Sequence, residues 1–257
     1  TLIKLGDTAK AHAEIEEMMG VNAGKADVVA ALRYLNSTVF TAEKNPSAAE
    51  RELLSAIDLD ADYLPAYLAY AGLLAEQNRA DEAVAQYKKI IEKRPGAQAF
   101  TMLGILEETR GNRTEAEAAY RSALEKEPDM PIAANNLAWL LAENNGNLDE
   151  ALRLANSAVS KGQSVAGYYD TLGWVYLKKG LTSPAVEQLK KAVALEEASA
   201  KRNGVAPNPG YRVRLGMALA KAGDKASAKR EVETSLQRAD FLSQREVNDA
   251  KNVLASL

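Results

Sequence analysis

The chain has 257 residues, of which 47% are hydrophobic, so it can bury a sizeable core. Its 32 basic and 35 acidic residues are mixed along the sequence and give a formal net charge of -3, which indicates neither a nucleic-acid-binding surface nor an acidic tail. Because the chain has no cysteine, disulfides and thiolate chemistry are excluded.

Helical periodicity predicts an all-α chain. Residues 1–24 are expected to form a partial repeat with one amphipathic helix. Residues 26–60 are expected to form a degenerate helical hairpin, in which Asn45 caps a helix that begins at Pro46. The last segment, 241–257, predicts an amphipathic helix that caps the stack. Between them, complete hairpins are predicted over 64–96, 97–129, 131–164, 166–199 and 209–239.

The hairpin over 166–199 indicates how these units pack. Gly173 lies inside its first helix, where glycine costs about 1 kcal/mol relative to alanine. We therefore expect a close approach of the second helix, through Ala185 and Ala192, to require it. Ser183 is expected to cap that second helix.

The same pattern of small and large residues recurs along most of the chain. Its small anchor residues, spaced 33, 34, 35 and 43 residues apart, are Ala71, Gly104, Ala138, Gly173 and Gly216. The long last step coincides with the polar segment 198–208, which we expect to be a loop or a helix extension. With a period of about 34 residues of helix, turn and helix, the chain resembles the tetratricopeptide repeat family. The resemblance implies an all-α, right-handed superhelical solenoid, and we expect residues 1–257 to form one such array.

Residues 131–257 are also similar to a narrower group. Their segments NNLAWLLAENNGNLDEALRLA and YYDTLGWVYLKKG resemble the last repeats of bacterial tetratricopeptide repeat proteins of exopolysaccharide and PEP-CTERM protein-sorting systems. This resemblance implies a multiprotein assembly of the bacterial periplasm or envelope rather than the cytoplasm, with any signal or anchor upstream of Thr1. No apolar run in the sequence is long enough to span a bilayer, so direct membrane insertion is not expected.

In the tetratricopeptide repeat family, the first helix of each hairpin lines a concave groove. The side chains located one residue after and three residues before each anchor residue point into that groove. This implies equivalent groove positions for the two tryptophans of the chain, Trp139 and Trp174. Two interpretations stay open: they bind a partner, or they pack between adjacent helices. Arg214 belongs either to the same groove or to the ordinary charged surface. The candidate groove residues are Thr101, Ile105, Asn135, Trp139, Asp170, Trp174, Arg214 and Met217.

The residue types argue against catalysis. The chain has a single histidine, His12, which we expect to be solvated or to pack against its neighbours. Carboxylate pairs such as Glu107 and Glu108 are expected on solvated helix faces, and the glycines occupy turns and packing positions rather than a phosphate-binding loop. We therefore expect no enzyme activity, no catalytic residue, no metal site and no cofactor.

The sequence favours a scaffold or adaptor that binds a protein or peptide segment in its concave groove. Carboxylate-clamp members of the family hold chaperone C-termini through basic residues, which are absent from matching positions such as Thr101 and Ile105, so that ligand is not expected. The alternative is a self-assembling structural module with no separate peptide ligand. A third hypothesis, saccharide binding by the aromatic groove, follows from the exopolysaccharide resemblance. Nucleic acid is not an expected partner.

Overall fold

A computed structural model describes residues 7–144 and 146–257 of the chain. Those residues form α-helices joined by short connections, with one short 3-10 helix and no strand. Their contacts divide the chain into two compact units, which we call unit 1 (residues 1–128) and unit 2 (residues 129–257). The all-α class is confirmed, whereas one continuous array over 1–257 stays a prediction. No helix in the described part of the chain is both long and apolar enough to cross a membrane.

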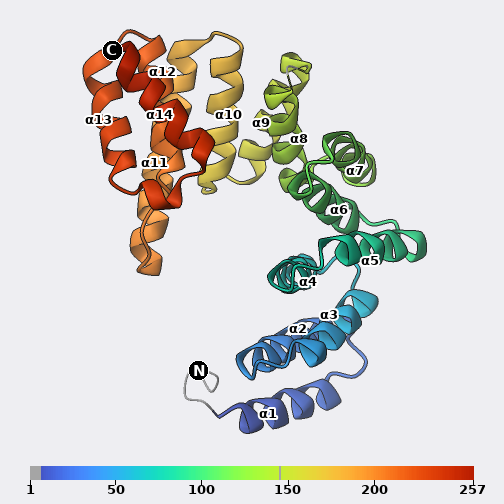
Figure 1. The fold of residues 1–257 in the computed structure, drawn as a ribbon. Coiled ribbons are helices and arrows are strands. Elements are labelled where there is room, and N and C mark those ends of the chain that lie inside the picture. Colours follow the sequence, from blue (N-terminus) through green and yellow to red (C-terminus); the bar gives the residue numbers. More distant parts are fainter. Residues whose placement is uncertain (1–6, 145) are drawn as a thin grey trace. The chain divides into compact units, whose positions relative to one another are not determined.

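Unit 1 is a succession of helices in which chain neighbours pack together (Figure 1). Its helices are α1 (Thr8–Val21), α2 (Ala26–Ala42), α3 (Pro46–Leu59), α4 (Leu64–Glu76), α5 (Ala80–Lys93), α6 (Ala97–Thr109) and α7 (Arg113–Lys126). They match the partial repeat and the three hairpins predicted before residue 130; residues 1–6 of that partial repeat lie outside the described residues. Asn45 caps α3 as predicted, because its side chain accepts a hydrogen bond from the Ala48 backbone N–H at 3.2 Å.

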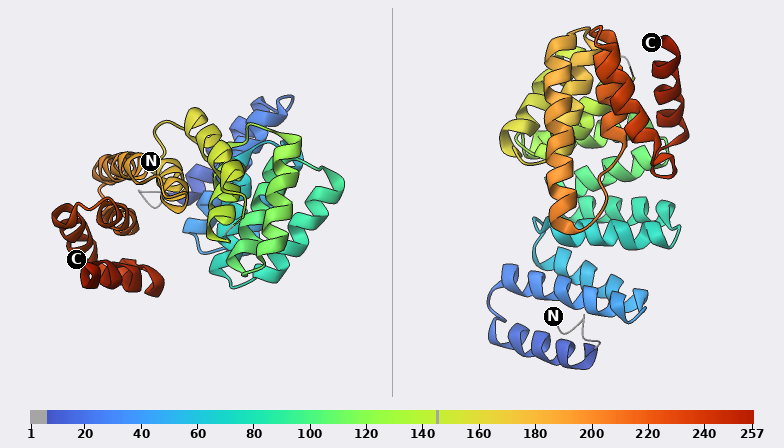
Figure 2. Two further views of the ribbon diagram at one scale, coloured as in Figure 1. Left: turned by 90° about the horizontal axis from the view of Figure 1, so that it is seen from above. Right: turned by 90° about the vertical axis from the view of Figure 1, so that its left-hand side faces the viewer.

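Unit 2 continues the same pattern of hairpins. Its helices are α8 (Pro131–Glu143), α9 (Leu148–Lys161), α10 (Ala166–Lys178), α11 (Thr182–Asn203), α12 (Gly210–Lys221), α13 (Lys225–Leu236), the 3-10 helix η2 (Ala239–Phe241) and α14 (Gln244–Ser256). The predicted cap, α14, packs against α12 and α13. Segment 198–208 is a helix extension followed by a loop, and the extended α11 is the long orange helix in Figure 2. Gly204 ends it in the left-handed conformation, with φ of 67°.

Glycine at the anchor positions lets the two helices of a hairpin approach closely. A Cβ atom added to Gly173 would lie 2.6 Å from Leu189 Cγ and 3.2 Å from the Ala185 carbonyl oxygen. One added to Gly104 in unit 1 would lie 2.5 Å from Tyr120 Cε1. The close approach predicted at Gly173 is confirmed, with Leu189 as the side chain that fills the space.

Two predictions about individual helix residues are wrong. Glu107 does not lie on a solvated face, because its side chain accepts hydrogen bonds from Arg110 Nη1 and Asn112 Nδ2, both at 2.8 Å, and the residue is 3% exposed. The carboxylate therefore joins the end of α6 to the turn that follows it. Ser183 does not cap α11, which begins one residue earlier at Thr182 without a side-chain cap.

Candidate functional site

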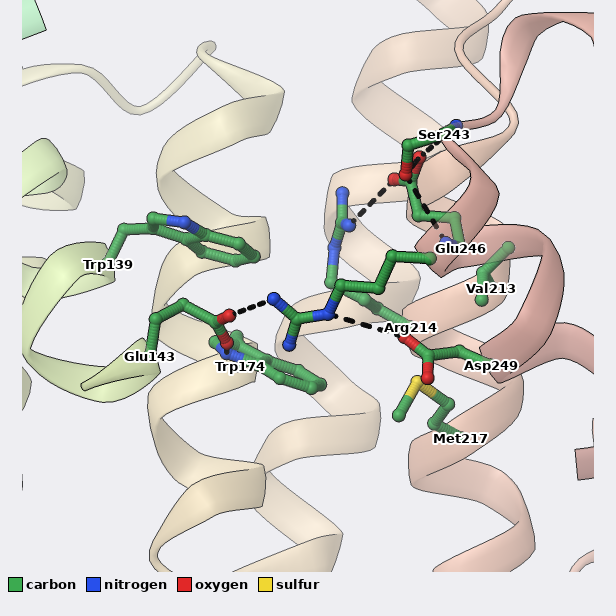
Figure 3. A pocket seen from close by; sticks show the side chains of 10 residues that line it. Trp139, Glu143, Trp174, Val213, Arg214, Met217, Ser243, Glu246 and Asp249 are labelled. Carbon is green, nitrogen blue, oxygen red and sulfur yellow. Dashed lines mark hydrogen bonds and ion pairs between the residues drawn. The ribbon is translucent and has the colours of Figure 1, made fainter. Parts of the chain in front are cut away.

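Unit 2 contains a cavity of about 210 Å³ between helices that are distant in sequence (Figure 3). We call it the tryptophan pocket. It is lined by α8, α10, α12 and the N-terminal end of α14, through Trp139, Glu143, Trp174, Val213, Arg214, Met217, Ser243, Arg245, Glu246 and Asp249. The pocket therefore lies where the first helices of successive hairpins meet the C-terminal helix.

The two tryptophans form one wall of the pocket. Their rings are stacked, with centroids 5.9 Å apart and an angle of 29° between the planes. Such a pair is worth about 0.5–1.5 kcal/mol beyond the area it buries. Trp174 is buried, while Trp139 is partly exposed. The tryptophans thus pack against each other from adjacent first helices and also line a cavity. Their binding of a partner stays a prediction.

Glu143 is a nearly buried carboxylate beside this wall, with 8% of its side chain exposed. Its Oε1 atom accepts a hydrogen bond of 2.8 Å from Trp174 Nε1, and its Oε2 atom pairs with Arg245 Nη1. Lys178 Nζ lies 3.8 Å from Oε1 and 5.0 Å from the centroid of the Trp174 ring. Burial by itself raises the pKa of Glu143, but the hydrogen bonds from Arg245 and Trp174 and the charges of Arg245 and Lys178 outweigh it and lower the pKa.

Arg214 is held at the pocket by two carboxylates. Its Nε atom lies 2.7 Å from Asp170 Oδ1 and its Nη1 atom lies 3.2 Å from Glu246 Oε1. Its guanidinium carbon is 5.4 Å from the centroid of the Trp139 ring, within range of a cation–π interaction. Only 13% of the side chain is exposed, so Arg214 is not an ordinary surface charge.

The Asp170–Arg214 pair is buried, and its two members respond differently. Burial raises the pKa of Asp170, and Arg214 opposes that rise. Burial also acts against the charged form of Arg214, but Asp170 and Glu246 together raise its pKa, so the guanidinium stays protonated. Both pKa values are thus raised, which disfavours the charged form of Asp170 and favours that of Arg214. Arg214 has two carboxylate partners, whereas Asp170 has one cationic partner.

A capping box fixes the start of α14 at the pocket. The Ser243 hydroxyl accepts from the Glu246 backbone N–H at 3.3 Å, and the Glu246 carboxylate accepts from the Ser243 backbone N–H at 2.9 Å. The same carboxylate reaches Arg214, so one side chain both caps α14 and joins it to α12. These hydrogen bonds, with burial opposing them, lower the pKa of Glu246.

The structure brings together half of the predicted groove residues. Those that line the pocket are Trp139, Trp174, Arg214 and Met217. Asp170 lies behind it and positions Arg214, while Asn135 lies outside the lining and donates from its amide to Asn136 Oδ1 at 3.1 Å. Thr101 and Ile105 belong to unit 1.

The prediction of Thr101 as a surface contact is wrong in this structure. Its side chain is fully buried, with 0% exposed, and its hydroxyl donates to the Ala97 carbonyl oxygen at 2.8 Å. A threonine in this position satisfies its polar group within its own helix and presents nothing to a ligand. Ile105, one turn further along α6, is partly exposed.

Sequence reasoning identified Arg214 but missed the other charged residues of the pocket. Glu143 lies five residues after its anchor, as Lys178 does in the next hairpin, and that shared offset is a signal the sequence contains. The contributions of Ser243, Arg245 and Glu246 were missed because α14 was assigned only a capping role. Their places in the pocket depend on how α14 docks.

No histidine is among the residues that line the tryptophan pocket. The described residues contain no cluster of three or more histidine, aspartate or glutamate side chains that could hold a metal ion. His12 lies in unit 1, where it packs against Phe40 with ring centroids 4.3 Å apart and contacts Asn36 Oδ1 through Nδ1 at 2.5 Å. The lining combines two indoles, two guanidinium groups and three carboxylates.

Repeated hairpins with close-packed anchor residues define an α-helical repeat protein. Family models described as tetratricopeptide repeat match residues 40–105, 101–166 and 166–199. The chain belongs to the tetratricopeptide repeat family, and its family and fold are typical of non-enzymatic scaffolds for protein–protein interaction.

Two curated relatives and one solved structure illustrate the similarity. The chain is 35% identical over 97 residues to the probable biofilm formation methyltransferase WspC of Pseudomonas putida, a match that covers 37% of this chain and 23% of that protein. It is 25% identical over 189 residues to the TPR repeat-containing protein PA4667 of Pseudomonas aeruginosa, which covers 73% of this chain and 31% of that one. The chain thus spans less than a third of the length of either relative.

The solved structure extends the comparison to nearly the whole fold. Cut9, in the APC/C hetero-tetramer Cut9-Hcn1, superposes with a TM-score of 0.68 at 16% identity, over 98% of this chain and 47% of Cut9. At that identity the match establishes the fold alone.

Proposed function

We propose that the chain is a non-enzymatic scaffold that binds a segment of a partner protein at the tryptophan pocket of unit 2. The observation that carries this proposal is the stacked pair of Trp139 and Trp174 on the wall of a cavity. Tryptophan is enriched at interaction hot spots, because it buries a large area at little cost in rotamer entropy. Charged groups around the indoles supply the polar contacts that orient a segment once its apolar part is buried.

We further propose that the scaffold acts in a bacterial multiprotein assembly of the envelope or periplasm. The similarity of residues 131–257 to envelope repeat proteins favours this setting, and both curated relatives come from Pseudomonas. The fold itself occurs in multiprotein complexes, since the Cut9 structure is a hetero-tetramer with Hcn1.

The test is a comparison of crosslinked partners in the source organism. Tagged wild-type chain, Trp139→Ala and Phe241→Ala are crosslinked in cells, purified and analysed by mass spectrometry. Phe241 is the matched control, because it is an aromatic residue of unit 2 that is 69% exposed and lies outside the pocket. We expect a specific partner to be lost from Trp139→Ala and kept by Phe241→Ala. An identical set of crosslinked proteins for all three chains, each with a native melting curve, would contradict the assignment of the pocket.

Self-association is the second candidate function, and an exposed apolar edge of unit 1 favours it. Val21 is 81% exposed and Met18 is 50% exposed, both on α1. Such residues favour contact with a second copy of the chain. Sedimentation of wild type and of the double variant Met18→Lys, Val21→Lys tests this: association that depends on concentration and is abolished by the substitutions supports it, and a monomer at all concentrations removes it.

A further inference from the structure

The carboxylate of Glu143 is already occupied by an arginine of the same chain. Arg245, which is 102 residues away in sequence, extends from the first turn of α14 and pairs with Glu143 Oε2. The two partners differ in exposure: 8% of the Glu143 side chain is accessible, against 61% of the Arg245 side chain. A nearly buried anion is thus covered by a cation that solvent reaches freely.

Without Arg245 the pocket would be acidic and aromatic. Its lining would keep three carboxylates, Glu143, Glu246 and Asp249, against one guanidinium, that of Arg214. Arg214 is itself engaged by Asp170 and Glu246, so it does not neutralise Glu143. Lys178 Nζ, 3.8 Å from Glu143 Oε1, and Trp174 Nε1 would remain beside one oxygen of Glu143, and Oε2 would lose its partner. An indole wall beside that free carboxylate oxygen is a favourable environment for a planar cation, which can stack on the ring and form a charge-assisted hydrogen bond.

Building on the function proposed above, we propose that the tryptophan pocket is a guanidinium-binding site, that Arg245 is its internal occupant, and that an arginine side chain of the partner segment replaces Arg245 on Glu143. Arginine fits better than lysine because its planar fork presents parallel donors to a carboxylate while its face stacks on an aromatic ring. Glu143 Oε1 is held by Trp174 Nε1 at 2.8 Å, so Oε2 is the oxygen that changes partner.

Arg245 can leave without undoing the fold around it. Asp249 Oδ2 lies 3.9 Å from its Nε atom, one turn along the same helix, and offers a second acceptor. The start of α14 is fixed independently by the Ser243–Glu246 capping box, and Ala250 and Val253 are buried further along the helix. An ion pair in which one member is more than half exposed contributes little net stability. Exchange of one guanidinium for another on Glu143 therefore costs little free energy of folding.

The test uses the full chain and N-acetyl-arginine methylamide as the probe. The indole N–H signals of Trp139 and Trp174 are followed by ¹H–¹⁵N NMR, because Trp174 Nε1 donates directly to Glu143 and reports a change at that carboxylate. We expect Arg245→Ala to bind the probe with a saturable shift of the Trp174 signal. Wild type should bind at least about tenfold more weakly, since its site is occupied internally for most of the time.

Matched variants and probes make the result specific. Lys251→Ala removes an exposed cation of the same helix that does not line the pocket, and it should behave as wild type. Glu143→Gln in the Arg245→Ala background should abolish binding, whereas Glu187→Gln, on the exposed face of α11, should not. The citrulline analogue of the probe keeps the shape and loses the charge, and should not bind.

Several outcomes overturn the inference. Equal affinities of Arg245→Ala and wild type for the arginine probe would show that Arg245 occupies no ligand site. Absence of binding by Arg245→Ala, in a variant that melts as a folded protein, would show the same. Equal binding of the citrulline analogue would exclude recognition of charge, and preference of wild type for N-acetyl-glutamate methylamide would show that Arg245 itself binds the ligand. If the arginine probe fails while Trp139→Ala still loses its crosslinked partner, the scaffold stands and only the guanidinium site is wrong.

Discussion

Units 1 and 2 are built on the same repeat but differ at the residue that follows each anchor. In unit 1 these residues are Gly72 and Ile105; in unit 2 they are Trp139, Trp174 and Met217. A Cβ added to Gly72 would meet no atom within 4 Å, whereas both indoles of unit 2 line a pocket. Anchor positions thus determine how closely the two helices of a hairpin pack, and the positions beside them determine which side chains the first helices present.

The buried polar groups of the two units differ in the same way. Unit 1 buries tyrosines in its core, and the Tyr87 hydroxyl donates to the Tyr67 carbonyl oxygen at 2.7 Å. Unit 2 also buries tyrosines, but next to its pocket it buries both members of an ion pair, Asp170–Arg214. In unit 1, by contrast, the buried Glu107 pairs with Arg110, whose side chain is 30% exposed. A neutral hydroxyl satisfied by a backbone carbonyl serves stability alone, while a buried ion pair costs desolvation and needs another reason to be present. We attribute it to the positioning of the pocket wall.

The largest effect is expected from breaking that ion pair. Arg214→Ala leaves Asp170 buried without its cation, which typically costs about 3–5 kcal/mol of unfolding free energy. Denaturation followed by tryptophan fluorescence reports unit 2 specifically, because both tryptophans lie there. The control Arg230→Ala removes a residue whose side chain is 69% exposed and should change little. A similar loss in both variants would refute the special status of Arg214.

Overpacking of an anchor should destabilise both units alike. Gly173→Leu in unit 2 and Gly104→Leu in unit 1 each force a side chain into the space of Leu189 or Tyr120, at a cost of at least about 1–3 kcal/mol. Thermal melts by circular dichroism measure the effect. A melt of Gly173→Leu that coincides with that of wild type would disprove the packing role assigned to the anchors.

The residue beside an anchor should respond in the opposite direction. Gly72→Ala replaces a glycine inside α4 in open space, so we expect stabilisation by about 0.5–1 kcal/mol from helix propensity. Gly104→Ala, in the first helix of the next hairpin, should destabilise the protein because its Cβ would meet Tyr120. Chemical denaturation measures the change in unfolding free energy of the two alanine variants. A change of the same sign in both would contradict the distinction between anchor positions and the positions beside them.

The smallest expected effect is on how the stability of unit 2 varies with pH in the acid range. The folded-state pKa of Glu143 is lowered from the usual value of 4.5, so its contribution to stability is complete above that pH and is lost as the pH falls through the lowered pKa. Glu143→Gln should therefore flatten the acid limb of the stability curve measured by tryptophan fluorescence. Curves of wild type and variant that stay parallel below pH 4.5 would contradict this assignment.

Local pattern predicted most of the fold and part of the site. Helix positions followed from periodicity and from turns such as Asn45–Pro46, and the equivalence of Trp139 and Trp174 followed from their shared offset. The Arg245–Glu143 pair was out of reach, because nothing in the sequence relates residues 102 positions apart in a chain whose repeats contact their neighbours. The burial of Thr101 was missed because a groove position was inferred from spacing, and spacing does not reveal what covers a helix face.

The central claim is that a partner segment occupies the tryptophan pocket, and site-specific photo-crosslinking tests it most directly. A benzophenone amino acid placed at Met217, which lines the pocket, is compared in cells with the same group at Glu187, on the exposed face of α11. We predict a discrete adduct with one partner protein from position 217 and none from position 187. No adduct at position 217, or the same adducts from both positions, would contradict the claim.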